Sequence, residues 1–117
     1  KPEDEEQKRL TFAQSATGAS GIETLLSLSL ELYHNGSVKL ETIIKALTSN
    51  PAKILKINKG NLSKGNNADF CIVDINKPWI VKKEKLFSKS KNTSIEDKKL
   101  QGKVTNTFVK GEELFTL

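Results

Sequence analysis

The first half of the chain has apolar residues at the spacing of amphipathic helices. In the first predicted helix an apolar stripe is formed by Ile22, Leu25, Leu26, Ser29, Leu32 and Tyr33. Because Leu28 and Leu30 fall off that stripe, we expect this helix to be buried on most of its sides. The spacing predicts helices over residues 22–34, 38–49 and 52–56.

Polar and glycine-containing segments flank these helices. The charged residues 1–10 predict an exposed loop or a frayed turn, and the small residues 11–21 predict a flexible loop that leads into the first helix. Asn35-Gly36 is a typical helix end. Asn50-Pro51 supplies a cap residue and a first-position proline for the third helix.

In the second half of the chain the pattern changes to that of short strands. Leu62, between two turns, predicts a short strand, and the polar stretch 82–101 has only Leu86 and Phe87 as isolated apolar anchors. Cys71 lies in an apolar run and is expected to be a buried small hydrophobe. The main strands are predicted at residues 69–74, 78–81, 104–109 and 113–117, with a tight hairpin turn at 110–112.

Helices therefore come first and strands second. That order does not build a parallel β-α-β sheet by itself, so it predicts the end of one architecture followed by part of another. The 117 residues leave room for one domain at most. The chain contains no methionine, and we expect it to be a piece of a longer protein.

The charge of the chain invites a nucleic-acid hypothesis, which its composition argues against. The net charge is +5, but all of its 19 cationic residues except Arg9 are lysines interspersed with acids, without arginine forks or interleaved aromatics. We therefore rank an independent basic binding module last. No apolar run is long enough to span a membrane, and no secretory leader is evident. The single cysteine is typical of the reducing cytoplasm.

Few residues of the chain are suited to catalysis or to metal binding. His34 is the only histidine and Cys71 the only cysteine, 37 positions apart, so they predict no zinc site. His34 is expected at the exposed C-terminal end of a helix, where its charge favours the helix dipole. The acids at 3–6 lack the spacing of a calcium loop. One local feature does suit a ligand: Thr17-Gly18 precedes a helix, where free N–H groups bind anions such as carboxylates.

Residues 48–55 read TSNPAKIL, and residues 60–70 read GNLSKGNNADF. These two segments resemble sequence steps of the amidohydrolase superfamily. Three further segments, 12–24 (FAQSATGASGIET), 87–93 (FSKSKNT) and 102–111 (GKVTNTFVKG), resemble segments of dihydroorotases in particular. The resemblance covers about residues 8–117.

The resemblance implies an α/β fold, namely the C-terminal part of a (β/α)8 metal-dependent hydrolase barrel followed by strands of a small composite β-sandwich. Residues 1–21 would be the substrate loop after barrel strand 8, residues 22–56 the last barrel helices, and residues 57–117 the C-terminal share of the sandwich. If the barrel is absent, the helix at 22–34 should expose a large apolar patch.

The function implied by the resemblance is that of a zinc-dependent cyclic amidohydrolase, which interconverts N-carbamoyl-L-aspartate and dihydroorotate in pyrimidine biosynthesis. Thr17 and Gly18 would offer backbone contacts to this substrate. The family's zinc ligands are not among these residues, so the chain alone is expected to be inactive. Partners would be the rest of its own chain, a second copy or aspartate transcarbamoylase. Two alternatives remain open: a non-catalytic dihydroorotase-like subunit, and another cyclic amidohydrolase such as an allantoinase or hydantoinase.

Overall fold

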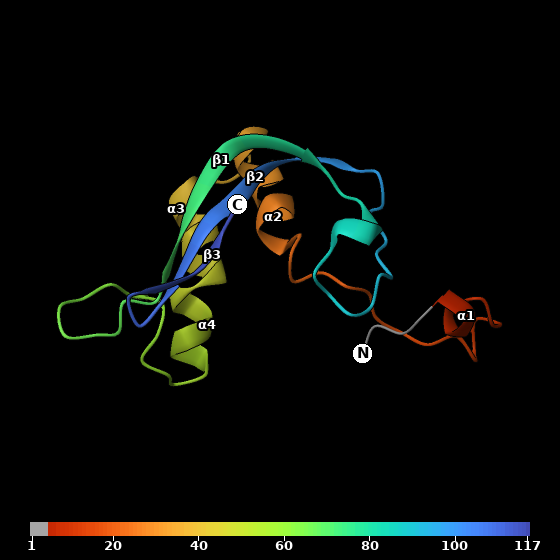
Figure 1. Ribbon diagram of the computed structural model, residues 1–117, viewed down its shortest axis with the longest axis horizontal. Coiled ribbons are helices and arrows are strands. Elements are labelled where there is room, and N and C mark those ends of the chain that lie inside the picture. Colours follow the sequence, from red (N-terminus) through yellow and green to blue (C-terminus); the bar gives the residue numbers. More distant parts are fainter. Residues whose placement is uncertain (1–4) are drawn as a thin grey trace.

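The computed structural model of the chain describes residues 5–117, and Figure 1 shows its strands arching over the central helix α2. The predicted order of helices before strands is confirmed, with a single helical turn, α1, in the segment expected to be an exposed loop or a frayed turn. The described helices are α1 (Glu5–Lys8), α2 (Leu25–His34), α3 (Leu40–Leu47), α4 (Ser49–Ile54) and the 3-10 helix η1 (Lys83–Lys85).

The strands form one antiparallel sheet in the order β1-β2-β3. Its members are β1 (Phe70–Ile80), β2 (Lys99–Val109) and β3 (Glu112–Thr116). The predicted hairpin is confirmed: Val109 pairs with Glu112, and Lys110 and Gly111 between them have φ angles of 53° and 83°. Two consecutive positive φ values are the geometry of the turn that matches the natural twist of a hairpin.

The two strands predicted at 69–74 and 78–81 are one strand, β1. Asp74 pairs with Lys103 and Pro78 with Gln101, so β1 carries extra residues opposite Gly102. Proline is tolerated at such a bulge because no ladder hydrogen bond needs its missing N–H. The proline and polar residues that suggested a break in the strand therefore mark a bulge within it.

The core lies where α2 crosses β2. Leu30 of α2 is completely buried, and so is Val81, while Leu100 of β2 retains only 3% of its surface. Gly102 faces Leu30 so closely that a Cβ atom there would meet Leu30 Cδ1 at 2.3 Å. The main chain of β2 therefore lies so close to Leu30 of α2 that only a glycine fits at position 102.

The face of α2 that is buried differs from the prediction. The buried side of α2 and its cap is Thr24, Ser27 and Leu30, whereas Leu25 and Leu32 of the predicted stripe are exposed. The expectation that α2 is buried on most sides is therefore wrong within the described chain. An outward apolar patch, which was expected in the absence of a barrel, is present.

Several smaller expectations are also corrected. Helix α4 begins at Ser49, so Pro51 is its third residue and not its first. A proline is tolerated there because the N–H groups of the first four helical residues have no carbonyl partner within the helix. Leu62 lies in no strand. Strand β2 begins at Lys99, inside the stretch expected to be polar loop. Cys71 is exposed, because α2 covers β2 and reaches little of β1.

The described chain is open in shape for its size. Its radius of gyration is 16.4 Å, against about 13 Å for a compact domain of this length. Its accessible surface is 8778 Å², against about 6,300 Å² for a folded monomer of this mass. Much of the excess is apolar, with Ile22 and Ile54 almost fully exposed. None of the described helices has the length and apolar character needed to cross a membrane.

Candidate substrate loop and its supports

Thr17 and Gly18 lie in an exposed, irregular segment between α1 and α2. Gly18 has a φ of 93°, a conformation that favours glycine over every residue with a side chain. Within the described residues, no hydrogen-bond partner is found for the N–H groups of Thr17, Gly18 or Ala19. Three successive main-chain donors are thus open to a ligand, and no described side chain contributes an acceptor to them.

Lys8, the last residue of α1, supports this segment from the other side. Its amino group donates to the carbonyl oxygens of Ala16, at 2.6 Å, and Gly18, at 2.5 Å. The hydroxyl of Ser15 donates to the Lys8 carbonyl at 3.1 Å. In a trans peptide group the carbonyl and the N–H point in opposite directions, so holding the carbonyls of Ala16 and Gly18 on Lys8 directs the N–H groups of Thr17 and Ala19 away from it.

Ser20 joins this segment to a loop that is about 70 positions away in the sequence. Its N–H donates to the Asn92 carbonyl and its hydroxyl to the Ser90 carbonyl, each at 2.8 Å. The same hydroxyl lies 3.2 Å from the hydroxyl of Ser88. The two segments that separately resemble dihydroorotases, 12–24 and 87–93, are therefore in direct contact.

Glu23 makes a second connection between the same two segments. Its two carboxylate oxygens accept the N–H groups of Phe87, at 3.0 Å, and Ser88, at 2.9 Å. Hydrogen bonds to an ionised carboxylate are stronger than those between neutral groups. The carboxylate therefore holds two consecutive peptide groups of the distant loop in a defined orientation.

The distant loop is closed firmly at its base, where it leaves the sheet. Val81 donates to the Lys98 carbonyl and Asp97 to the Val81 carbonyl, at 3.0 and 2.9 Å. The ion pair between Lys82 and Asp97 raises the pKa of Lys82, through its hydrogen bond and then its charge. Leu86 is buried just before the contacts with Ser20 and Glu23. The loop is thus anchored to the sheet on one side and to the Thr17–Gly18 segment on the other.

The sequence suggested that the free N–H groups belong to the N-terminus of the first long helix, but in the structure they lie before it. Helix α2 begins at Leu25, and its cap residue Thr24 uses its hydroxyl to donate to the Gly21 carbonyl at 3.2 Å. A turn therefore separates Gly18 from the helix. A hollow of about 420 Å³ lies at this turn, lined by residues 19–24 and 86–88.

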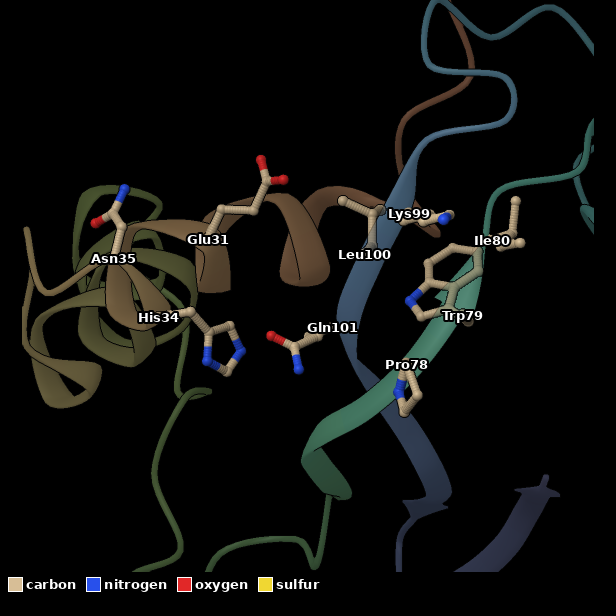
Figure 2. Close-up of a pocket in the computed structure, with 9 residues that line it drawn as sticks. All are labelled: Glu31, His34, Asn35, Pro78, Trp79, Ile80, Lys99, Leu100 and Gln101. Atoms are coloured by element: carbon tan, nitrogen blue, oxygen red, sulfur yellow. The ribbon is translucent and has the colours of Figure 1, made fainter.

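A larger open hollow of about 930 Å³ lies between the end of α2 and strands β1 and β2. Figure 2 shows the His34 ring and the Gln101 side chain directed into the same space. His34 is the exposed last residue of α2, as predicted, but Asn35 and Gly36 close the helix through their own N–H groups. Glu31, also at the hollow, is paired with Lys98 at 2.8 Å.

The described residues do not form a metal site. No group of three or more histidine, cysteine, aspartate or glutamate residues is close enough to hold an ion in residues 5–117. The expected acids at 3 and 4 lie outside the described residues. Neither hollow brings His34 and Cys71 together, and a zinc ion needs about four ligands. The residues that the structure describes therefore do not fit a catalytic metal.

The fold is shared with solved cyclic amidohydrolases. A D-hydantoinase superimposes with a TM-score of 0.86 over 97% of this chain and 25% of its own, at 20% identity. The L-hydantoinase of Arthrobacter aurescens gives 0.82 over 90% of this chain and 25% of its own, at 27% identity. The implied fold class, a C-terminal part of a barrel hydrolase with its small sheet, is confirmed by these structures.

The sequence comparisons identify the family. A model of the amidohydrolase family matches residues 9–114, so the chain belongs to that family. The dihydroorotase of Ehrlichia canis is 41% identical over 98% of this chain and 26% of its own length, and that of Ehrlichia chaffeensis is 40% identical over 97% and 26%. The chain therefore spans about a quarter of the length of the curated relatives it matches.

Sequence reasoning predicted a ligand-binding role for Thr17 and Gly18, and it did not single out the residues that hold this segment in place. Lys8, Ser20 and Glu23 were not singled out, although Ser20 and Glu23 lie within the dihydroorotase-like segment 12–24. Lys8 binds main-chain carbonyls eight and ten positions away, and Ser20 and Glu23 bind main-chain atoms of the distant loop. Main-chain partners of this kind leave no mark in the sequence. The available signal was that two separate segments, 12–24 and 87–93, both resemble dihydroorotases.

Proposed function

We propose that this chain is the C-terminal part of a dihydroorotase, the enzyme that interconverts N-carbamoyl-L-aspartate and dihydroorotate. The observation that carries the proposal is the 41% identity to a dihydroorotase over nearly the whole chain, with hydantoinases at 20–27%. The contact between the two dihydroorotase-like loops supports it. The Thr17–Gly18 segment is the part of the chain that would meet the substrate.

The role proposed for this segment is to bind the substrate carboxylate. Thr17 and Gly18 have N–H groups without partners in the described chain, and a carboxylate accepts such donors well. Lys8 adds a cation beneath the loop. Since no acidic side chain is hydrogen-bonded to this segment within residues 5–117, the local field favours an anion.

We propose that residues of the preceding barrel hold a catalytic zinc ion. When bound, the ion would act as a Lewis acid and activate the attacking water. The described residues contain no ligand set for it, and we assign no catalytic step to this chain. Residues 1–21 would be the substrate loop after barrel strand 8, residues 22–56 the last barrel helices, and residues 57–117 the C-terminal strands of the small sandwich.

The exposed apolar residues support this division. Leu25 and Leu32 of α2 and Ile54 and Leu55 of α4 lie open in the described chain, a patch that a stable protein covers. We propose that the preceding part of the same protein covers it. We further propose a cytoplasmic location. We also propose a second copy or aspartate transcarbamoylase as a partner, and the mass of the purified intact protein would test for such a complex.

The decisive experiment assays the intact protein that contains this chain on dihydroorotate, hydantoin and allantoin, each with zinc present. We expect turnover of dihydroorotate only. Turnover of hydantoin or allantoin in its place would assign the protein to another cyclic amidohydrolase, and no turnover with a correctly folded protein would favour a scaffolding subunit. A matched pair then tests the loop: Gly18→Ala and Gly65→Ala impose the same strain, at φ 93° and 94°, and only the first should impair activity.

A further inference from the structure

The carboxylate of Glu23 is used in an unusual way for a residue next to a helix N-terminus. It caps no N–H group of α2; both of its oxygens accept from Phe87 and Ser88, 64 and 65 positions away. A carboxylate fits this task because each oxygen accepts one of two adjacent peptide donors. An amide of the same shape would offer one acceptor and direct its own N–H₂ at the other donor.

The connection lies close to the open donors of the substrate loop. Glu23 is five positions after Gly18, and Ser20 between them is bonded to Ser90 and Asn92. Both residues hold on to the same loop, whose base is fixed to the sheet at Val81 and Lys98. The position of the Thr17–Ala19 donors is therefore set by the sheet, through the loop 86–92, as well as by Lys8.

We propose that Glu23 is a positioning residue for substrate binding, and that it acts by fixing the loop 86–92 against the loop that carries Thr17 and Gly18. This inference rests on the proposed function for its substrate. Glu23 itself does not touch the substrate; it determines where the three free N–H groups lie. The loop 86–92 thereby becomes part of the specificity of the site without contributing a side chain to it.

A residue of this kind has a characteristic kinetic effect. The N–H groups would contact a carboxylate that stays charged from the bound substrate through the transition state. Loss of such uniform binding raises KM and leaves kcat nearly unchanged. A purely structural defect would lower the fraction of active enzyme, and hence the apparent kcat, while KM stayed the same.

The test compares Glu23→Gln with Glu31→Gln in the intact, zinc-loaded protein. Both variants remove one charge from the same helical segment, and Glu31 also bridges to a distant residue, Lys98, at 2.8 Å. We expect KM for dihydroorotate to rise about tenfold in Glu23→Gln, the loss of one charge-assisted bond, and to stay within about twofold in Glu31→Gln. Equal KM values in the two variants would overturn the proposal.

Ser20→Ala provides a milder variant should Glu23→Gln fold poorly. It keeps the Ser20 N–H bond to Asn92 and removes only the hydroxyl contacts, so KM should rise by about threefold to fivefold. Amide hydrogen exchange gives a readout that needs no activity: residues 87 and 88 should lose protection in Glu23→Gln and keep it in Glu31→Gln. Unchanged protection of residues 87 and 88 in Glu23→Gln would overturn the proposed role of Glu23. If the wild-type protein showed this protection but no activity on dihydroorotate, only the proposed function would be overturned.

Discussion

Two junctions hold the described chain together, and they do so by different means. Where α2 crosses β2, Leu30 is completely buried against Gly102, and no larger residue fits at that glycine. Where the loop 17–24 meets the loop 86–92, the contacts are hydrogen bonds: Ser20 donates to two main-chain carbonyls, and the Glu23 carboxylate accepts from two main-chain N–H groups. Phe87, in the middle of that second junction, remains 82% exposed.

The difference separates stability from geometry. Close packing contributes free energy in proportion to the apolar surface removed from water, so the helix–sheet junction should dominate the stability of the chain. A hydrogen bond in the folded state replaces one to water and contributes little net energy, but it fixes direction. The loop junction should therefore matter more for the position of the Thr17–Gly18 segment than for folding.

The largest expected effect is at the centre of the helix–sheet junction. Leu30→Ala in the intact protein should lower the free energy of unfolding by about 3–4 kcal/mol, because it leaves a cavity between α2 and β2. Denaturant titration measures this loss. Leu62→Ala, at a loop position that is 70% exposed, should cost less than about 0.5 kcal/mol. Similar losses for both would contradict the dominance of this junction.

A second change separates backbone strain from close approach at the same junction. Gly102→Ala and Gly65→Ala impose similar φ angles, 95° and 94°, on an alanine. The new Cβ meets Leu30 at position 102 and nothing within 4 Å at position 65. We expect a loss of about 1 kcal/mol at Gly65 and about 3 kcal/mol at Gly102. Repeating Gly102→Ala in the Leu30→Ala background should remove most of the difference, since the cavity accepts the methyl group.

At the loop junction the expected effect on stability is small and the effect on activity larger. Lys8→Met keeps the side-chain stem and removes the donor to the carbonyls of Ala16 and Gly18. We expect unfolding to change by less than about 1 kcal/mol, with a rise in KM for dihydroorotate. Lys39→Met, on the exposed surface before α3, is the control. A loss of stability as large as that of Leu30→Ala would remove the distinction between the junctions.

The smallest effect lies outside both junctions, at the surface pair of Asp69 and Lys59. Hydrogen bonds from the Lys59 amino group and then the Lys110 N–H lower the pKa of Asp69 below its ordinary 3.8. Because the folded-state pKa is the lower one, this stabilisation is present above about pH 3.8 and is lost as the pH falls through the folded-state value. Melting curves against pH should show a slightly flatter acid limb in Asp69→Asn than in the unmodified protein.

The sequence alone determined the order of helices before strands, the hairpin at Lys110-Gly111 and the helix end at Asn35-Gly36. Each depends on local chemistry: apolar spacing, or the backbone freedom of glycine and asparagine. Its motif-like segments also identified the family by resemblance, and the comparisons confirmed it.

Only the tertiary structure decided which face of α2 is buried, that Cys71 is exposed, and that one bulged strand replaces two. Apolar periodicity predicts that one face of a helix is covered, but it does not tell which part of the protein covers that face. In α2 the face that meets the sheet is the one carrying Ser27 and Leu30, where the glycine of β2 allows close approach, while the more apolar stripe faces outward. The bonds of Ser20 and Glu23 were equally hidden, since main-chain partners have no residue identity and only folding brings them together.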